Sequence, residues 1–234
     1  MILCIETSTK VCSVALVSPH GPVAVRESDE GKSHASLLTI FIKEILSRAG
    51  IEAKDLDAVA VSKGPGSYTG LRIGVSVAKG ITYAVSVPLI GIETTHSMFY
   101  GIDEPVRHRY NAFEDSLFVP MLDARRMEVY YSVFDSKGSI IKEVRPEIIT
   151  SDHFMEYPEK LKIFIFGDGA EKCKPVLKRK NIIFIDEYRI TASHMYIPAY
   201  EAFYEKKFED IAYFEPFYFK DFIATRPGRK ISGK

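Results

Sequence analysis

Residues 62–74 read SKGPGSYTGLRIG, a glycine-rich stretch between two apolar runs. The run before it, LDAVAV, predicts a buried strand, and the run after it predicts an apolar helix. This order of strand, glycine-rich turn and helix is typical of α/β proteins, and the backbone N–H groups at such a helix start attract anions. The stretch is therefore either a phosphate-binding loop or a tight turn whose glycines serve packing.

The spacing of the glycines argues against the phosphate-binding motifs. No Gly-Lys-Ser/Thr closes the stretch, so it is not a P-loop. Gly64 and Gly66 fit the start of the dinucleotide pattern GxGxxG, and Glu93 ends a later strand, where a ribose-binding acid is expected. The third glycine comes one position late, and the stretch lies outside the first strand–helix unit. A dinucleotide-binding oxidoreductase is therefore the weakest functional interpretation.

The composition is that of a soluble globular protein. The 234 residues are 46% hydrophobic and 26% charged, and the formal net charge is +0, so no general attraction to nucleic acid or membrane is expected. The three cysteines lack a CxxC pair, and the six histidines form neither HxxxH nor HExxH, so we expect no metal site of the chain's own. With no signal-peptide pattern and no long uncharged apolar run, we expect a cytoplasmic protein that does not enter a membrane.

The order of the predicted elements indicates an α/β fold with mixed sheets. In the first half, strands are predicted at residues 2–5, 11–17, 23–27, 56–64 and 88–94, and helices at 34–49 and 69–86. The charged segment 101–116 carries no period, which predicts a boundary between a first domain, 1–103, and a second domain, 104–234. The C-terminal helix and tail of the second domain are candidates to pack back on the first.

The two halves share a pattern. In each half an apolar strand ends in an acid, Glu6 or Asp123, and a short polar turn leads to a second apolar strand, 12–17 or 129–134. Two acids at equivalent strand ends could hold a Mg²⁺-bound phosphate in a cleft between the halves. This candidate vestigial nucleotide site comprises Glu6, Thr7, Asp123, Gly167 and Gly169. The alternative for each acid is a solvated strand end or a hydrogen bond within a turn.

The two helices of the first half carry more apolar residues than one sheet face needs. In the helix after the glycine-rich stretch, Gly70, Gly74 and Ala78 recur every four residues and form a face that another backbone can approach closely. We interpret part of both helices as a surface that a protein partner covers, the alternative being an ordinary core helix. The expected interface residues are His34, Leu37, Leu38, Phe41, Ile45, Gly70, Leu71, Gly74, Ala78 and Ile81.

The motifs resemble those of one family. ILCIETSTKVCSVALV, GPGSYTGLRIG, PLIGIET, LDARRMEVYY and FEPFYFKDF occur in the order seen in the TsaB (YeaZ) family, and the resemblance covers nearly the whole chain. It implies a two-domain fold of the actin/Hsp70/sugar-kinase (ASKHA, ribonuclease H-like) kind. Members of the family are accessory subunits of the bacterial machinery that makes threonylcarbamoyladenosine in tRNA.

The resemblance also implies partners. We expect a non-catalytic scaffold that binds and stabilises the paralogue TsaD, helps recruit the ATPase TsaE, and forms a homodimer when TsaD is absent. ATP and a metal would then act through those partner subunits, and tRNA contact would be indirect or through the basic C-terminal tail. The alternative is a self-sufficient ATPase or small-molecule kinase that uses Glu6 and Asp123. A peptidase activity is not supported, because the sequence shows no nucleophile that is matched with a general base.

Overall fold

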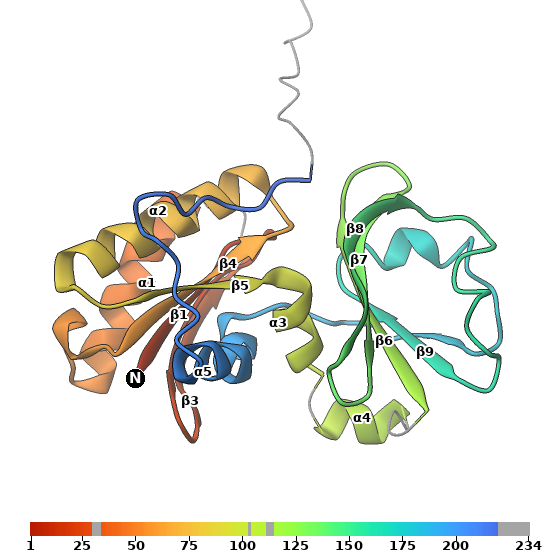
Figure 1. Ribbon diagram of the computed structural model, residues 1–234, viewed down its shortest axis with the longest axis horizontal. Helices are drawn as coiled ribbons and strands as arrows, with labels where there is room; N and C mark the ends of the chain where they lie inside the picture. The colour runs from red at the N-terminus through yellow and green to blue at the C-terminus, as the bar shows by residue number, and fades with distance from the viewer. Residues whose placement is uncertain (30–33, 103, 111–114, 220–234) are drawn as a thin grey trace, which may run out of the picture.

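The computed structural model describes residues 1–29, 34–102, 104–110 and 115–219. It contains two five-stranded sheets, whose arrangement Figure 1 shows. The first sheet is formed by β1 (Ile2–Glu6), β2 (Cys12–Ser18), β3 (Gly21–Ser28), β4 (Ala58–Gly64) and β5 (Leu89–Glu93). The second is formed by β6 (Ser116–Asp123), β7 (Glu128–Asp135), β8 (Ile140–Ile148), β9 (Lys162–Phe166) and β10 (Ile182–Phe184). The helices are α1 (His34–Ala49), α2 (Tyr68–Val85), α3 (Thr94–Tyr100), α4 (Glu104–Tyr110) and α5 (Tyr196–Tyr204).

The two sheets have the same topology. Their strand orders are β3-β2-β1-β4-β5 and β8-β7-β6-β9-β10. In each sheet the first three strands of the chain pair antiparallel, and the last two add in parallel on the other side of the first. The repeat that the sequence predicted is therefore confirmed, with β1 equivalent to β6 and β2 to β7. This duplicated mixed sheet is the architecture of the actin/Hsp70/sugar-kinase class.

Helices cover both faces of the first sheet. On one face, α1 packs over β2 and β3 and α2 over β4, and their apolar side chains share one core with Leu3, Ile5 and Val14. On the opposite face lies α5, where Ala199 and Tyr200 pack against Ile2 and Ile90 (Figure 1). The C-terminal helix therefore belongs to the core of the first sheet, although it follows the second sheet in the chain.

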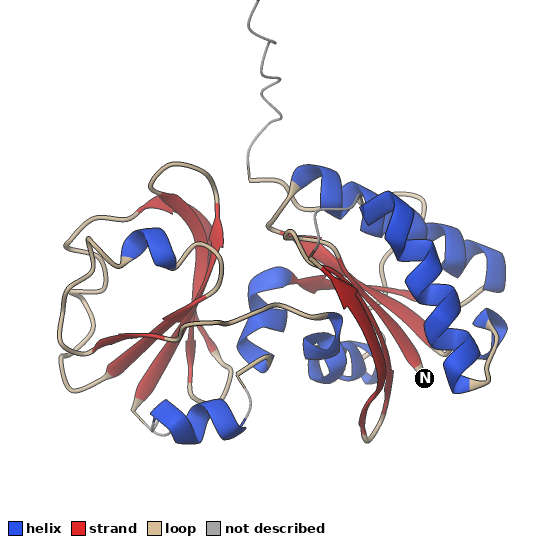
Figure 2. Cartoon of the chain, turned by 180° about the vertical axis from the view of Figure 1, so that it is seen from behind, coloured by secondary structure: helices blue, strands red, loops and turns tan. Residues whose placement is uncertain are grey.

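The second sheet is covered less extensively by helices than the first. One face packs against Phe154 and Leu177, which lie in irregular segments and turns rather than in long helices (Figure 2). The other face meets α3, whose Met98 and Phe99 join a core with Phe118 and other aromatic residues. Since α3 follows β5 directly, it links the two sheets through a packed contact.

Helix α4 lies in the charged segment 101–116, in which no helical period was found. At seven residues it spans about two turns, which is too short for a 3.6-residue apolar repeat to stand out. No helix among the described residues is both long enough and apolar enough to cross a bilayer.

Candidate functional site

The glycine-rich stretch packs against the turn that follows β1. The backbone N–H of Ser67 donates to Ser8 O at 2.6 Å. A side chain at Gly66 would collide with Ser8, and one at Gly70 with the carbonyl oxygen of Thr7. A side chain at Gly74, one helical turn further, would collide with Thr7 Oγ1. The glycines therefore bring α2 and its preceding loop close to the chain's own first turn.

This contact corrects the expectation that Gly70, Gly74 and Ala78 form an outward face for another protein. All three are buried beneath α2 in the chain's own core. The same holds for four of the expected interface side chains, Leu38, Phe41, Ile45 and Leu71, which are at most 5% exposed. Only His34, Leu37 and Ile81 of the expected set are partly exposed. The sheet and the helix–helix contact absorb more of the apolar surface than the helical pattern alone indicated.

What the two helices turn outward is a narrower surface, called here the outer helix face. It consists of Ser36, Thr39, Ile40 and Lys43 on α1, and Ser76, Gly80, Tyr83 and Ala84 on α2. Ile40 is 51% exposed and Tyr83 is 81% exposed. Ser76, Gly80 and Ala84 form a second row of small residues four apart, and a Cβ at Gly80 would meet nothing within 4 Å. The surface open to close approach is therefore the row at Gly80, not the row at Gly74.

Glu6 lies at the end of β1 and is completely buried. Its Oε1 accepts a hydrogen bond from the N–H of Ser8 at 2.6 Å. Burial raises the pKa of the Glu6 carboxyl, and its hydrogen bonds with Ser8 and Ser62 offset this only in part. The structure thus encloses this acid in the first domain, where a solvated Mg²⁺-bound phosphate cannot reach it without rearrangement. The side-chain oxygen of the neighbouring Thr7 is buried as well.

Asp123 lies at the end of β6 and is half exposed, with an ion pair to Lys172. Its Oδ1 also accepts a hydrogen bond from the N–H of Arg125 at 2.9 Å. Burial by itself raises the pKa of Asp123, but the hydrogen bonds and charges of Lys172 and Arg125 outweigh it and lower the pKa. The two glycines of the predicted site serve local packing: a side chain at Gly167 would collide with Met121 and Met98, and one at Gly169 would crowd Leu122.

The predicted nucleotide residues thus fall into two separate groups. Glu6 and Thr7 join the glycine-rich stretch of the first domain, while Asp123, Gly167 and Gly169 cluster around the end of β6. In the described part of the chain, no hydrogen bond or ion pair joins the two groups. That part also holds no group of three or more His, Cys, Asp or Glu suited to a metal ion. Both acids accept a hydrogen bond from a nearby turn N–H, and Asp123 also forms an ion pair with Lys172.

The C-terminal tail, named above as a candidate to pack back on the first domain, follows a path that the sequence did not predict. Residues 207–219 cross the first domain, where the N–H of Glu209 donates to Leu89 O at 2.8 Å and the N–H of Phe217 donates to Lys63 O at 2.6 Å. A Cβ at Gly64 would come within 2.6 Å of Phe217 O. The absence of a side chain at Gly64 therefore leaves room for the tail. The sequence alone does not show which segment packs against this glycine.

The end of the tail reaches both domains. The Arg72 guanidinium lies over the Tyr68 ring at 4.3 Å, and its Nε donates to Tyr218 Oη at 3.3 Å. Phe219 stacks on Tyr130 of β7, with 5.5 Å between ring centroids. The basic residues after it, with the predicted tRNA contact, lie outside the described residues.

Comparison with known proteins gives the chain a family. Residues 27–221 match the family model described as TsaD, tRNA N6-adenosine threonylcarbamoyltransferase. The tRNA threonylcarbamoyladenosine biosynthesis protein TsaB of Escherichia coli is 29% identical over 100% of this chain and 99% of that protein. The protein of the same name from Bacillus subtilis is 30% identical over 62% of this chain and 60% of that protein.

Two solved structures from Pseudomonas aeruginosa share the fold. One, titled as an uncharacterized protein with similarity to peptidase YEAZ, superposes with a TM-score of 0.78 at 20% identity and covers 94% of this chain and 99% of that one. The other, titled YeaZ, gives a TM-score of 0.76 at 21% identity over 93% and 98%. With its duplicated sheets and its match over nearly its whole length, the chain belongs to the TsaB (YeaZ) family within the proteins that the TsaD family model describes.

Proposed function

We propose that this chain is a non-catalytic subunit of the machinery that forms threonylcarbamoyladenosine in tRNA. The observation that carries the proposal is the match to TsaB along the full length of both chains. In the proposed role the chain binds and stabilises a catalytic TsaD-type paralogue and helps recruit the ATPase TsaE. ATP and a metal then act in those subunits, and the complex works in the cytoplasm, where tRNA is modified.

The enclosed acid supports a non-catalytic role. Phosphate bound to Mg²⁺ needs carboxylates that can reach the metal or its water ligands. Glu6 is buried with a raised pKa, and Asp123 is held by Lys172. The two carboxylates are therefore engaged within their own domains, which removes the main support for a self-sufficient ATPase or kinase.

The proposed contact with the paralogue uses the outer helix face. The row of Ser76, Gly80 and Ala84 lets a facing helix come close, and Ile40 and Tyr83 offer apolar area that water now covers. Because the paralogue matches the same family model, its own first two helices are the expected counterpart. A second copy of this chain could occupy the face when the paralogue is absent.

A reconstituted modification assay tests the catalytic assignment. TsaD-type and TsaE-type proteins of the same organism are mixed with unmodified tRNA, ATP and the threonylcarbamoyl donor, with and without this chain. We expect product only when the chain is present, and an undiminished rate with Glu6→Gln and with Asp123→Asn, checked for folding by circular dichroism. A loss of more than about tenfold in rate from Asp123→Asn, in a folded variant that still forms the complex, would place chemistry on this chain.

A further inference from the structure

β3 is an edge strand of the first sheet. It pairs with β2, whereas the opposite edge strand, β5, is bridged by the tail at Glu209. In the described part of the chain, no second strand pairs with β3. An exposed edge with apolar side chains is a template for another strand. Val23 and Val25 on β3 are 50% and 36% exposed, so this edge carries that feature.

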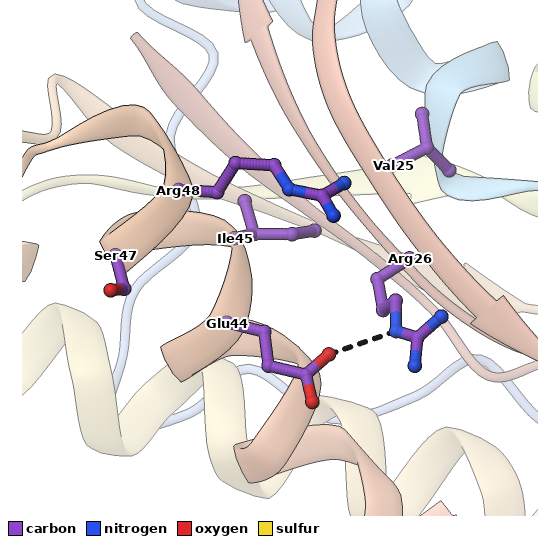
Figure 3. Close-up of a pocket in the computed structure, with 6 residues that line it drawn as sticks. All are labelled: Val25, Arg26, Glu44, Ile45, Ser47 and Arg48. Carbon is purple, nitrogen blue, oxygen red and sulfur yellow. Dashed lines mark hydrogen bonds and ion pairs between the residues drawn. The ribbon is translucent and has the colours of Figure 1, made fainter.

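A hollow of about 600 Å³ adjoins this edge (Figure 3). It is lined by Val25 and Arg26 from β3 and by Glu44, Ile45, Ser47 and Arg48 from α1. Glu44 Oε2 accepts from Arg26 Nε at 2.8 Å. No described residue forms an ion pair with Arg48, which points across the hollow in the same view. Two guanidinium groups against one carboxylate leave the hollow with an excess positive charge.

The acids that follow Arg26 in the chain have a cation of their own. Glu27, next to Arg26, and Asp29, just after β3, both pair with Arg189. An occupant with a carboxylate would therefore find the Arg48 guanidinium available, in the fork geometry that suits a carboxylate.

The pairing register between β2 and β3 determines which side chains an added strand would contact on each face of the sheet. Arg26 lies opposite Val14, whose side chain belongs to the core under α1, so Arg26 faces the α1 side. Val25 lies opposite Ala15, which belongs to the core on the α5 side. Successive side chains of a strand point to opposite faces. An added strand therefore meets positive charge on one face and apolar surface on the other.

We infer that the β3 edge and this hollow form a docking site for an extended acidic segment of another protein, which adds a strand to the first sheet. Its acidic side chains face Arg48 and Arg26, and the residues between them are apolar and face Val25. Backbone hydrogen bonds give affinity in this mode of recognition, and alternate side chains give specificity. A second copy of β3 fits less well, because it would bring its own Arg26 towards Arg48. The site goes beyond the proposed function and lies on the side of α1 away from α2.

The test is a titration of the full chain with a fluorescent eight-residue peptide of alternating Glu and Val, read by anisotropy. We expect saturable binding, about tenfold weaker for Arg48→Gln and for the Lys–Val peptide. Lys178→Gln, which removes a charge from an exposed position elsewhere, should leave affinity within about twofold. Methylation of alternate peptide nitrogens should abolish binding if a strand is added.

Several results would overturn the inference. These are equal binding of the Lys–Val peptide, unchanged affinity in Arg48→Gln, or no binding up to about 1 mM peptide. A dimer of the chain alone that Val25→Lys breaks and Gly80→Leu leaves intact would assign the edge to a second copy instead. Because binding is measured on the chain alone, failure here leaves the proposed function standing.

Discussion

Thr7 is the residue against which Gly70 and Gly74 pack. Its carbonyl oxygen lies against Gly70 and its hydroxyl against Gly74, so α2 approaches the first turn more closely than any larger residue permits. The hydroxyl is buried and has no hydrogen-bond partner among the described residues. The Thr7 side chain therefore contacts α2 through close packing and not through a hydrogen bond.

The close packing of Thr7 against α2 leaves no room for a side chain at Gly74. Gly74→Ala should lower the free energy of unfolding by about 1–3 kcal/mol, because the added methyl collides with Thr7 Oγ1. Gly80→Ala, in the same helix but with open space around it, should instead raise it by up to about 1 kcal/mol. Urea unfolding followed by circular dichroism gives both values. In Thr7→Ala the collision disappears, so the cost of Gly74→Ala should shrink; strictly additive costs would refute the contact.

The second prediction concerns the buried carboxyl of Glu6. Its pKa in the folded protein is raised above the ordinary 4.5. A group with a raised folded pKa stabilises the fold most below its unfolded pKa and loses that contribution as pH rises through the folded value. Glu6→Gln does not titrate, so the melting temperature of the variant relative to the wild type should climb as pH rises above about 4.5. A difference that stays flat between pH 4 and pH 8 would show that the carboxyl is solvated.

At the scale of elements, α2 carries two rows of small residues. The inner row of Gly70, Gly74 and Ala78 packs within the chain, and the outer row of Ser76, Gly80 and Ala84 faces water. The sequence shows both rows but does not say which one meets the sheet. Val75 and Leu71 lie in the core together with the inner row, and their burial determines which row faces the sheet.

The tail is the other element whose role depends on its partner. Phe214 is 9% exposed and packs in the core under α1 and α2, while its neighbour Tyr213 is 84% exposed. Phe214→Ala should therefore lower the free energy of unfolding by about 3 kcal/mol, by removing a buried ring. Tyr213→Ala, a matched removal of an exposed ring, should stay within about 0.5 kcal/mol of the wild type. Equal effects in a urea titration would mean that the tail does not pack on the first domain as described.

At the scale of the whole molecule, much of the fold follows from the sequence. Apolar runs ending in Glu6 and Asp123 were enough to predict the repeat, because each run is a buried strand that starts a sheet. The buried faces of α1 and the packing of Phe217 over Gly64 were not predictable, since they depend on segments distant in the chain. Apolar periodicity shows that a face is covered but not by which segment, and the interface residues were misplaced for that reason.

We propose that the outer helix face binds the TsaD-type paralogue. The most direct measurement is the mass, by size-exclusion chromatography with light scattering, of this chain mixed with that paralogue at micromolar concentration. We predict a complex with the wild type and with Gly80→Ala, and separate species with Gly80→Leu, whose side chain fills the open row without touching the chain's own core. A Gly80→Leu variant that forms the complex as readily as Gly80→Ala would show that the paralogue binds elsewhere.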